Sequence, residues 1–172
     1  MRAKQKNGFT LTELLVTIAI IAVLSAISVP VTFSLVERSR QTTCIENLRQ
    51  IGVGLRMYVG DNNDHLPELA IGRASKTSDE PVLETVLLGY IESKEVFHCP
   101  SDKKEFRKTG SSYNWNITQN GRRIDELSFL GNDNRPERIP LVSDKESWHN
   151  EKTHFLYADF SSSGKVRFVS DK

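Results

Sequence analysis

Four histidines and a scatter of serines are the side chains of this sequence that could take part in acid–base or nucleophilic catalysis. The histidines are His65, His98, His149 and His154. An enzyme site needs a nucleophile beside its base, or paired carboxylates in a pocket, and no Gly-x-Ser-x-Gly segment is present. His149 and Asp159 could form a dyad, although two such residues at fixed spacing around a hairpin are more often joined by a structural hydrogen bond. The residue pattern therefore argues against an enzyme.

Oxygen-bearing side chains raise calcium binding as a second hypothesis. Calcium takes six to eight oxygen ligands, with two or more carboxylates converging on the ion. The candidate carboxylates are Asp61, Asp64, Asp144 and Asp159, and the amides of Asn62, Asn63 and Asn132 with the carboxylate of Asp133 are further donors. No stretch has the spacing of an EF-hand loop, and residues 61–64 suit a helix stop and turn equally well. No cofactor other than this Ca²⁺ is expected.

The two cysteines, Cys44 and Cys99, both follow a long apolar segment. If that segment spans a membrane and the rest of the chain lies outside the cytoplasm, the pair is in a compartment where disulfides persist. We therefore expect a disulfide, which for a closed loop of this length contributes roughly 3–4 kcal/mol. Two buried free thiols are the alternative. A zinc site is less favoured, because His98 adjoins Cys99 and no second ligand pair has zinc spacing.

Glu13 directly precedes an apolar segment, which carries no charged residue from Leu14 to Val36. About 20 apolar residues at ~1.5 Å per helical residue cross a ~30 Å hydrocarbon core. The preceding basic residues, Arg2, Lys4 and Lys6, predict a cytoplasmic N-terminus. A carboxylate inside a bilayer costs roughly 2.5–3.5 kcal/mol, so Glu13 is a functional candidate. A secretory signal peptide would place its cleavage site after the apolar run, and an uncleaved anchor leaves Glu13 unexplained.

The junction between the basic head and the apolar run resembles the N-terminus of type IV prepilins, a family that includes the pseudopilins of type II secretion. The matching residues are Gly8, Phe9, Thr10, Leu11, Glu13, Leu14, Leu15 and Pro30. The resemblance implies that a membrane aspartic peptidase cuts after Gly8 and methylates the new amine of Phe9. It also implies that Glu13 pairs with a Phe9 amine during assembly and so sets the register between subunits.

The apolar run continues into an amphipathic stripe, and together they predict one helix from residue 9 to about 59. The residues of the stripe recur at helical spacing on one face: Ile45, Leu48, Gly52, Leu55 and Val59. Gly60 and the four polar residues after it supply a stop. The expected division of the chain is a leader, 1–8, an apolar helix, 9–30, its amphipathic continuation, 31–60, and a globular head, 61–172.

The head reads as α+β, with its β signal near the C-terminus. A short helix is expected between Pro81 and Tyr90. Short runs rich in β-branched and aromatic residues predict strands at 112–117, 139–142, 154–158 and 166–169. Residues 161–164 separate the last two, which should pair as an antiparallel hairpin. A long N-terminal helix packed on a small antiparallel sheet is also the pilin architecture that the resemblance implies.

The head further resembles one pilin-like group found with such N-termini. The matching pieces are residues 44–52, 57–62, 64–67, 97–102 and 112–114. That group carries a His-x₉-Asp-Gly motif near its C-terminus. His149 and Asp159 keep the spacing, but Phe160 stands where glycine is expected, and Gly164 is our candidate for the residue that makes the turn instead.

These resemblances imply a structural subunit, a pilin or pseudopilin, that joins copies of itself or related pilins in a type IV pilus-like or type II secretion filament. The expected partners are the prepilin peptidase, the inner-membrane assembly platform and the lipid bilayer. The protein would be single-pass in the inner membrane, with a periplasmic C-terminal domain, and then part of a periplasmic or extracellular filament. Without the three basic leader residues, 20 Lys and Arg face 22 acids. A net charge of −2 gives no electrostatic reason to expect nucleic acid as a partner of a major subunit.

A different function class stays open. A minor or tip pilin could act as a membrane-tethered binding module for carbohydrate or DNA, with Tyr113, Trp115 and Trp148 as an aromatic platform. The same aromatic residues could instead cover the core of a small sheet.

Overall fold

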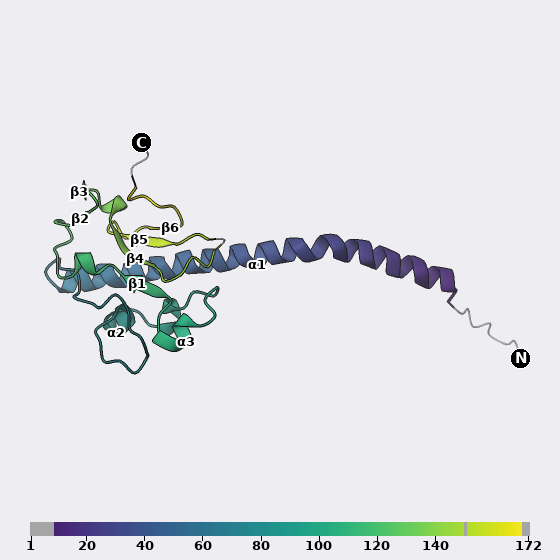
Figure 1. Cartoon of the computed structure of the whole chain (residues 1–172), viewed down its shortest axis with the longest axis horizontal. Coiled ribbons are helices and arrows are strands. Elements are labelled where there is room, and N and C mark those ends of the chain that lie inside the picture. The colour runs from purple at the N-terminus through teal and green to yellow at the C-terminus, as the bar shows by residue number, and fades with distance from the viewer. Residues whose placement is uncertain (1–8, 150, 170–172) are drawn as a thin grey trace, which may run out of the picture. The chain divides into compact units, whose positions relative to one another are not determined.

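The computed structural model describes residues 9–149 and 151–169, and the chain divides into two compact units. The first unit ends at Arg38, and the second runs from Ser39 onward. A single helix, α1 (Leu11–Asp61), contributes its first part to one unit and its second part to the other (Figure 1). The predicted N-terminal helix is confirmed, with its ends displaced by two residues.

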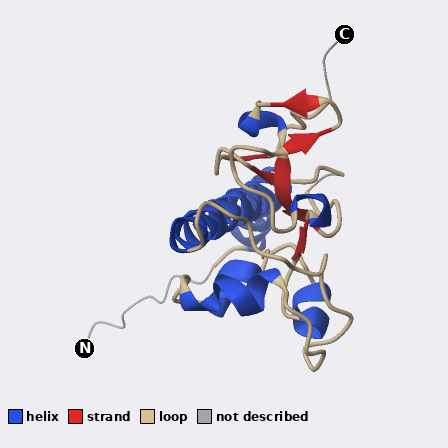
Figure 2. Ribbon diagram, turned by 90° about the vertical axis from the view of Figure 1, so that its left-hand side faces the viewer, coloured by secondary structure: helices blue, strands red, loops and turns tan. Residues whose placement is uncertain are grey.

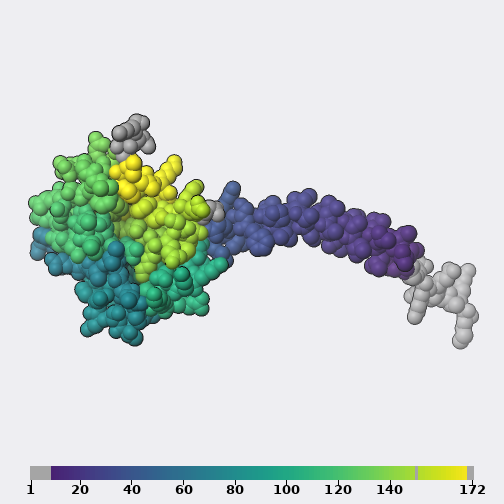
Figure 3. Space-filling model, in the orientation of Figure 1, coloured from purple at the N-terminus to yellow at the C-terminus, as the bar shows by residue number. Residues whose placement is uncertain are grey.

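In the first unit, α1 leaves its large apolar side chains exposed. Figure 3 draws this stretch of the helix in purple and dark blue. The large hydrophobic side chains from Leu14 to Val36 are 44–72% exposed. The hydroxyls of Thr17, Ser28 and Thr32 donate to backbone carbonyls three or four residues earlier, which satisfies these groups without water. The helix is long and apolar enough to cross a membrane.

In the second unit, α1 becomes the central element of the core. Its buried residues lie on one broad face: Cys44, Asn47, Leu48, Ile51, Gly52, Gly54, Leu55 and Val59. Except for Ile45, which is half-buried, the predicted stripe is fully buried. At Gly52 an added Cβ would lie 2.8 Å from Leu156 of the sheet, and at Gly54 one would lie 2.7 Å from Ile91. The helix is therefore covered closely from two directions.

The helix does not stop at Gly60 as predicted, but one residue later. Asn63 and Asp64 take left-handed backbone conformations, with φ of 53° and 62°. The backbone N–H groups of Asn62 and Asp64 both donate to the carbonyl of Val59. Asn and Asp tolerate this conformation better than other non-glycine residues, so the turn after α1 is made by them.

Four short antiparallel strands form the main sheet, in the order β1-β4-β5-β6. They are β1 (Tyr113–Trp115), β4 (Pro140–Asp144), β5 (Phe155–Tyr157) and β6 (Ser162–Ser163). Figure 2 shows these strands beside α1, which is seen nearly end-on. Buried residues of β1, β4 and β5, including Trp115, Leu141 and Leu156, join the α1 face in one core. The predicted α+β class is confirmed.

Short helices and one further hairpin complete the head. The α-helices are α2 (Leu83–Val86) and α3 (Glu105–Thr109). The 3₁₀ turns are η1 (Leu87–Gly89), η2 (Lys94–Phe97), η3 (Ile117–Gln119) and η4 (Pro136–Arg138). The predicted helix at 81–90 is thus split between α2 and η1.

The prediction of a last strand at residues 166–169 is wrong. The strand that pairs with β5 is β6, inside the segment predicted as a turn, because the chain reverses earlier, at Asp159 and Phe160. The Asp159 carboxylate accepts hydrogen bonds from the backbone and hydroxyl of Ser161. Phe160 takes φ of 61°. The turn is therefore made by Phe160 itself and not by Gly164, in a conformation that a bulky side chain rarely adopts.

The polar segment 131–140 contains a strand. β2 (Ser128–Phe129) and β3 (Asn132–Asp133) pair through a two-residue turn at Leu130 and Gly131. Both turn residues have positive φ, 49° and 76°, as hairpin turns that match strand twist require. Leu-Gly is not among the dipeptides that usually signal such a turn, so the turn could not be predicted from the sequence.

Candidate functional site

Thr10 and Glu13 form a closed set of hydrogen bonds at the start of α1. The carboxylate Oε2 of Glu13 accepts from the backbone N–H of Thr10 at 2.9 Å and from its hydroxyl at 2.8 Å. The backbone N–H of Glu13 in turn lies 3.2 Å from the Thr10 hydroxyl oxygen. This is the capping box, in which residues three apart satisfy each other's unpaired groups. The box holds a carboxylate at the N-terminal end of the uncharged stretch of α1, residues 14–36.

Phe9 directly precedes this box, and its side chain is 82% exposed. Gly8, the other residue of the predicted cleavage site, lies outside the described residues. An acidic residue near a helix N-terminus is favourably placed with respect to the helix dipole. The capping box and the helix dipole therefore make position 13 favourable for a carboxylate even without a second subunit.

Comparison with known proteins bears directly on this N-terminal region. Residues 3–29 match the family model described as the prokaryotic N-terminal methylation motif. The matched range includes Lys4 and Lys6 of the basic head, and Gly8, Phe9 and Glu13. This match supports the resemblance of the N-terminus to those of prepilins and pseudopilins.

A curated relative extends the likeness beyond the motif. The chain is 34% identical over 62 residues to the type II secretion system core protein G of Pseudomonas aeruginosa. The aligned part is 36% of this chain and 44% of that protein, so the match spans less than half of the relative. No solved structure matches the chain. Much of the head is thus known only from the structure described above.

In the head of this prepilin-type chain, Cys44 of α1 is joined to Cys99 by a disulfide, with 5.0 Å between the two Cα atoms. Both residues are completely buried. The side-chain amide of Asn47, one turn further along α1, donates to the carbonyl of His98 at 2.7 Å. The segment around Cys99 is therefore attached to α1 both covalently and by a hydrogen bond.

Asp102 accepts hydrogen bonds from several residues of the segment that follows Cys99. Its carboxylate accepts from the hydroxyl of Ser112 at 2.6 Å and from the backbone N–H groups of Lys104, Glu105 and Phe106. Burial by itself raises the pKa of Asp102, but these four donors stabilise the anion more strongly, so the net shift is to a pKa below the ordinary value. Because Ser112 precedes β1, Asp102 connects the start of α3 to the sheet.

The four aspartates proposed as calcium ligands occupy different settings. Asp61 and Asp64 are exposed at the end of α1, Asp159 is exposed in the β5–β6 turn, and Asp144 is buried at the end of β4. Within the described part of the chain, one cluster with metal-ligand spacing contains Asp144 together with His149 and His154. The other consists of Cys44, Cys99 and His149, so none of the other three aspartates belongs to either.

The proposed dyad and the proposed aromatic platform are also placed by the fold. His149 contacts Cys99, Ser101 and His154, while the Asp159 carboxylate accepts a hydrogen bond from Ser161. Tyr113 and Trp115 are each 1% exposed and belong to the core. A ligand cannot stack on them, so the core interpretation of these two aromatic residues is confirmed.

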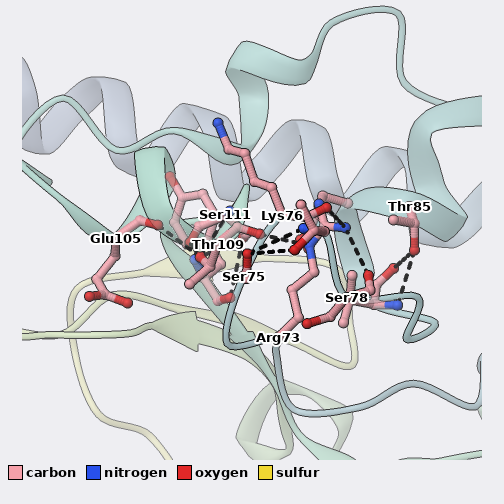
Figure 4. Close-up of polar contacts among 12 residues, drawn as sticks. Arg73, Ser75, Lys76, Ser78, Thr85, Glu105, Thr109 and Ser111 are labelled. Atoms are coloured by element: carbon pink, nitrogen blue, oxygen red, sulfur yellow. Dashed lines mark hydrogen bonds and ion pairs between the residues drawn. The ribbon is translucent and has the colours of Figure 1, made fainter.

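A cavity of about 490 Å³ lies beside the loop that connects α1 to α2. Figure 4 shows Arg73, on this loop, among backbone and hydroxyl groups of residues 75–78 and 109. Arg73 also forms an ion pair of 3.0 Å with Glu84, and both side chains are nearly buried. The cavity is lined by apolar and basic side chains, among them Lys76, Leu88, Lys94, Phe97 and Phe106.

Proposed function

We propose that the chain is a filament subunit whose apolar helix is first a membrane anchor and then part of a filament core. The observation that carries the proposal is the combination of a fully exposed apolar helix with a single carboxylate at its start. Such a surface needs a non-aqueous environment, which a bilayer provides before assembly and like helices provide afterwards. The match to a type II secretion protein supports this assignment.

Cleavage after Gly8 would turn the backbone nitrogen of Phe9 into an ammonium group one residue before the capping box. Its partner would be Glu13 of the same or a neighbouring subunit. In a dry helical core, pairing offsets the large desolvation penalty of both charges. A head-to-tail contact that does not close on itself produces a filament, and the charge pair would fix the axial step.

The processing step has a direct test. The full chain, extracted from membranes of cells that contain a prepilin peptidase, should begin at an N-methylated Phe9, as measured by intact-mass and N-terminal peptide mass spectrometry. Detection of an intact N-terminus beginning at Met1 as the main species would contradict the proposal.

The assembly step is tested with Glu13→Ala. Processing should remain largely intact, while the yield of sheared filaments should fall at least about tenfold, which corresponds to about 1.4 kcal/mol. Glu46→Gln is the matched control, because Glu46 is an acid on the same helix that is ion-paired with Arg49 at 2.9 Å outside the apolar segment. Normal filament yield from Glu13→Ala, or an equal loss from Glu46→Gln, would refute the role of Glu13.

A second candidate function, a tip subunit that binds a ligand, is favoured by the cavity beside Arg73. Its volume lies in the range of small-molecule sites, about 300–1,000 Å³, and lysines at its wall would suit an acidic sugar. Cellular abundance separates the two candidates, since a major subunit is made in large excess over a tip subunit. Quantitative proteomics of the sheared filament fraction measures this ratio.

A further inference from the structure

Three ionisable side chains meet in the interior of the head, where the chain passes from β4 to β5. Asp144 is the last residue of β4, His154 immediately precedes β5, and His149 lies in the connection. Asp144 is 4% exposed, His154 3% and His149 0%. One possible ligand atom from each residue lies within 4.8 Å of the others.

The polar atoms of this cluster are incompletely satisfied within the described structure. Asp144 Oδ2 accepts from the backbone N–H of His154 at 2.7 Å and lies 3.1 Å from His154 Nδ1. That second contact lacks hydrogen-bond geometry, so His154 Nδ1 is without a hydrogen-bond partner, as is Asp144 Oδ1. A buried polar group left in this state costs about 1–3 kcal/mol. The presence of two such unsatisfied atoms in one cluster indicates that the cluster binds a further group.

A third such atom lies close by. The hydroxyl of Tyr113 is buried and likewise has no hydrogen-bond partner among the described residues. Tyr113 and Asp144 are directly opposite each other in the β1–β4 register, and side chains of opposed residues lie on the same face of a sheet. Burial and the nearby Asp144 carboxylate raise the pKa of Tyr113, so it is a neutral phenol whose oxygen retains lone pairs.

The ring of His149 is held in a way that suits a metal ligand. Its Nδ1 lies 3.4 Å from the hydroxyl oxygen of Ser101, and its ring centroid is 4.5 Å from that of His154. Metal-bound histidines commonly use the second ring nitrogen for such a hydrogen bond, which fixes the orientation of the ring. Two imidazoles and one carboxylate are a ligand set for Zn²⁺, whereas calcium prefers oxygen ligands alone.

We propose that Asp144, His149 and His154 form a buried zinc site that joins the end of β4 to the start of β5. A divalent cation at this point supplies a partner for Asp144 Oδ1 and for His154 Nδ1, the two atoms of the cluster that have no hydrogen-bond partner among the described residues. Because the cluster is buried, a metal ion here would stabilise the fold and would not meet a substrate. The site thus acts as a second cross-link in a head whose strands have only two to five residues.

Cys44 and Cys99 also lie within 4.8 Å of His149, and Cys99 Sγ is 3.2 Å from His149 Nε2. In the structure these cysteines form a disulfide, and the thiolate, not the disulfide sulfur, is the metal ligand. The proposed site therefore uses the aspartate and histidine side of the cluster while the disulfide stays intact.

The test uses the full chain, extracted in detergent with its disulfide intact, stripped with a chelator and dialysed against Zn²⁺ or Co²⁺. We expect one metal ion per chain by elemental mass spectrometry and a rise in the thermal unfolding midpoint on adding Zn²⁺. Asp144→Asn and His154→Gln should weaken zinc binding at least about 100-fold, the upper end of what loss of an outer-shell partner causes. His98→Gln is the control, because His98 stacks on Phe106 outside the cluster.

The zinc content of the wild-type protein tests the proposed site even if the variants fail to fold. Less than one tenth of an equivalent of zinc after dialysis would overturn the site and leave a buried water as the partner of the unsatisfied atoms. Equal loss of zinc from His98→Gln would also overturn it. Thiolate-to-metal charge-transfer absorption in the Co²⁺ form would show that the cysteines are ligands and would overturn the proposed ligand set.

Discussion

Breaking the Cys44–Cys99 disulfide should remove a large part of the stability of the head. The two cysteines are 55 residues apart in the chain. In the chain-entropy relation, a loop of this size restricts the unfolded state by about 4 kcal/mol. Domains of this size have total stabilities of only about 5–15 kcal/mol, so the reduced head should be close to the limit of folding.

The location of the bridge supports the full effect. Cys44 and Cys99 are both completely buried, and the core residues next to Cys99 are Val96 and Phe97. After reduction, the hydrogen bond from Asn47 to the His98 carbonyl is the remaining polar link of this segment to α1 among those described here. One such hydrogen bond contributes about 1 kcal/mol, which does not replace the cross-link.

The assay is urea unfolding of the full chain in detergent, followed by the fluorescence of buried Trp115. With a slope of about 2 kcal/mol per molar urea, a loss of about 4 kcal/mol lowers the midpoint by about 2 M. Reduction of the wild type and the double variant Cys44→Ala/Cys99→Ala should give similar shifts. Reduction should also increase the slope, since the unfolded chain becomes less compact.

Val59→Ala is the matched control, because Val59 is a buried residue of the same helix that is not part of the cross-link. It should lower the midpoint without changing the slope. The reasoning is refuted if reduction lowers stability by less than about 1 kcal/mol. A fall in midpoint with an unchanged slope would instead assign the effect to lost native packing.

Two further predictions concern the head. Because the folded pKa of Asp102 is lowered, its stabilisation is complete above the ordinary aspartate pKa of about 3.9 and is lost as the pH falls through the folded value. Asp102→Asn should lower the free energy of unfolding by about 3 kcal/mol at neutral pH. It should also make this free energy fall less steeply as the pH is lowered into the acid range. If the acid dependence of the variant equals that of the wild type, Asp102 is not its cause. Gly60→Ala, in an open part of α1 with no atom within 4 Å of the added Cβ, should stabilise the chain by about 0.5–1 kcal/mol. Gly54→Ala should destabilise it by about 1–3 kcal/mol, because its Cβ would meet Ile91 at 2.7 Å, and chemical denaturation that gives both glycine variants the same sign would contradict this packing.

The N-terminal region could be predicted from the sequence because its determinants are local. Helical hydrogen bonds join residues four apart, and the absence of charge from Leu14 to Val36 is a property of consecutive residues. The Thr10–Glu13 capping box likewise spans only three positions. The helix, its two kinds of surface and its match to the methylation motif therefore needed no knowledge of the rest of the chain.

The C-terminal part of the head shows the limit of this approach. The β-branched run at 166–169 predicted a strand, but the turn at Asp159 and Phe160 brings Ser162 and Ser163 beside β5 instead. Strand pairing depends on where the chain reverses and on which residues it meets, and a shift of one or two residues changes every partner. Intrinsic β propensity carries little of that information.

The interior polar cluster was decided by tertiary structure alone. His149 was singled out with Asp159, ten residues further on, whereas the fold places it beside His154, Ser101 and the Cys99 sulfur. Ser101 and Cys99 are about fifty residues away in the chain. Spacing along one segment is informative where hydrogen bonds are local, but a buried site is assembled from segments that meet only when the core has packed. The sequence by itself thus determined the apolar helix and the motif at its start, and the tertiary structure decided which side chains of the head lie together.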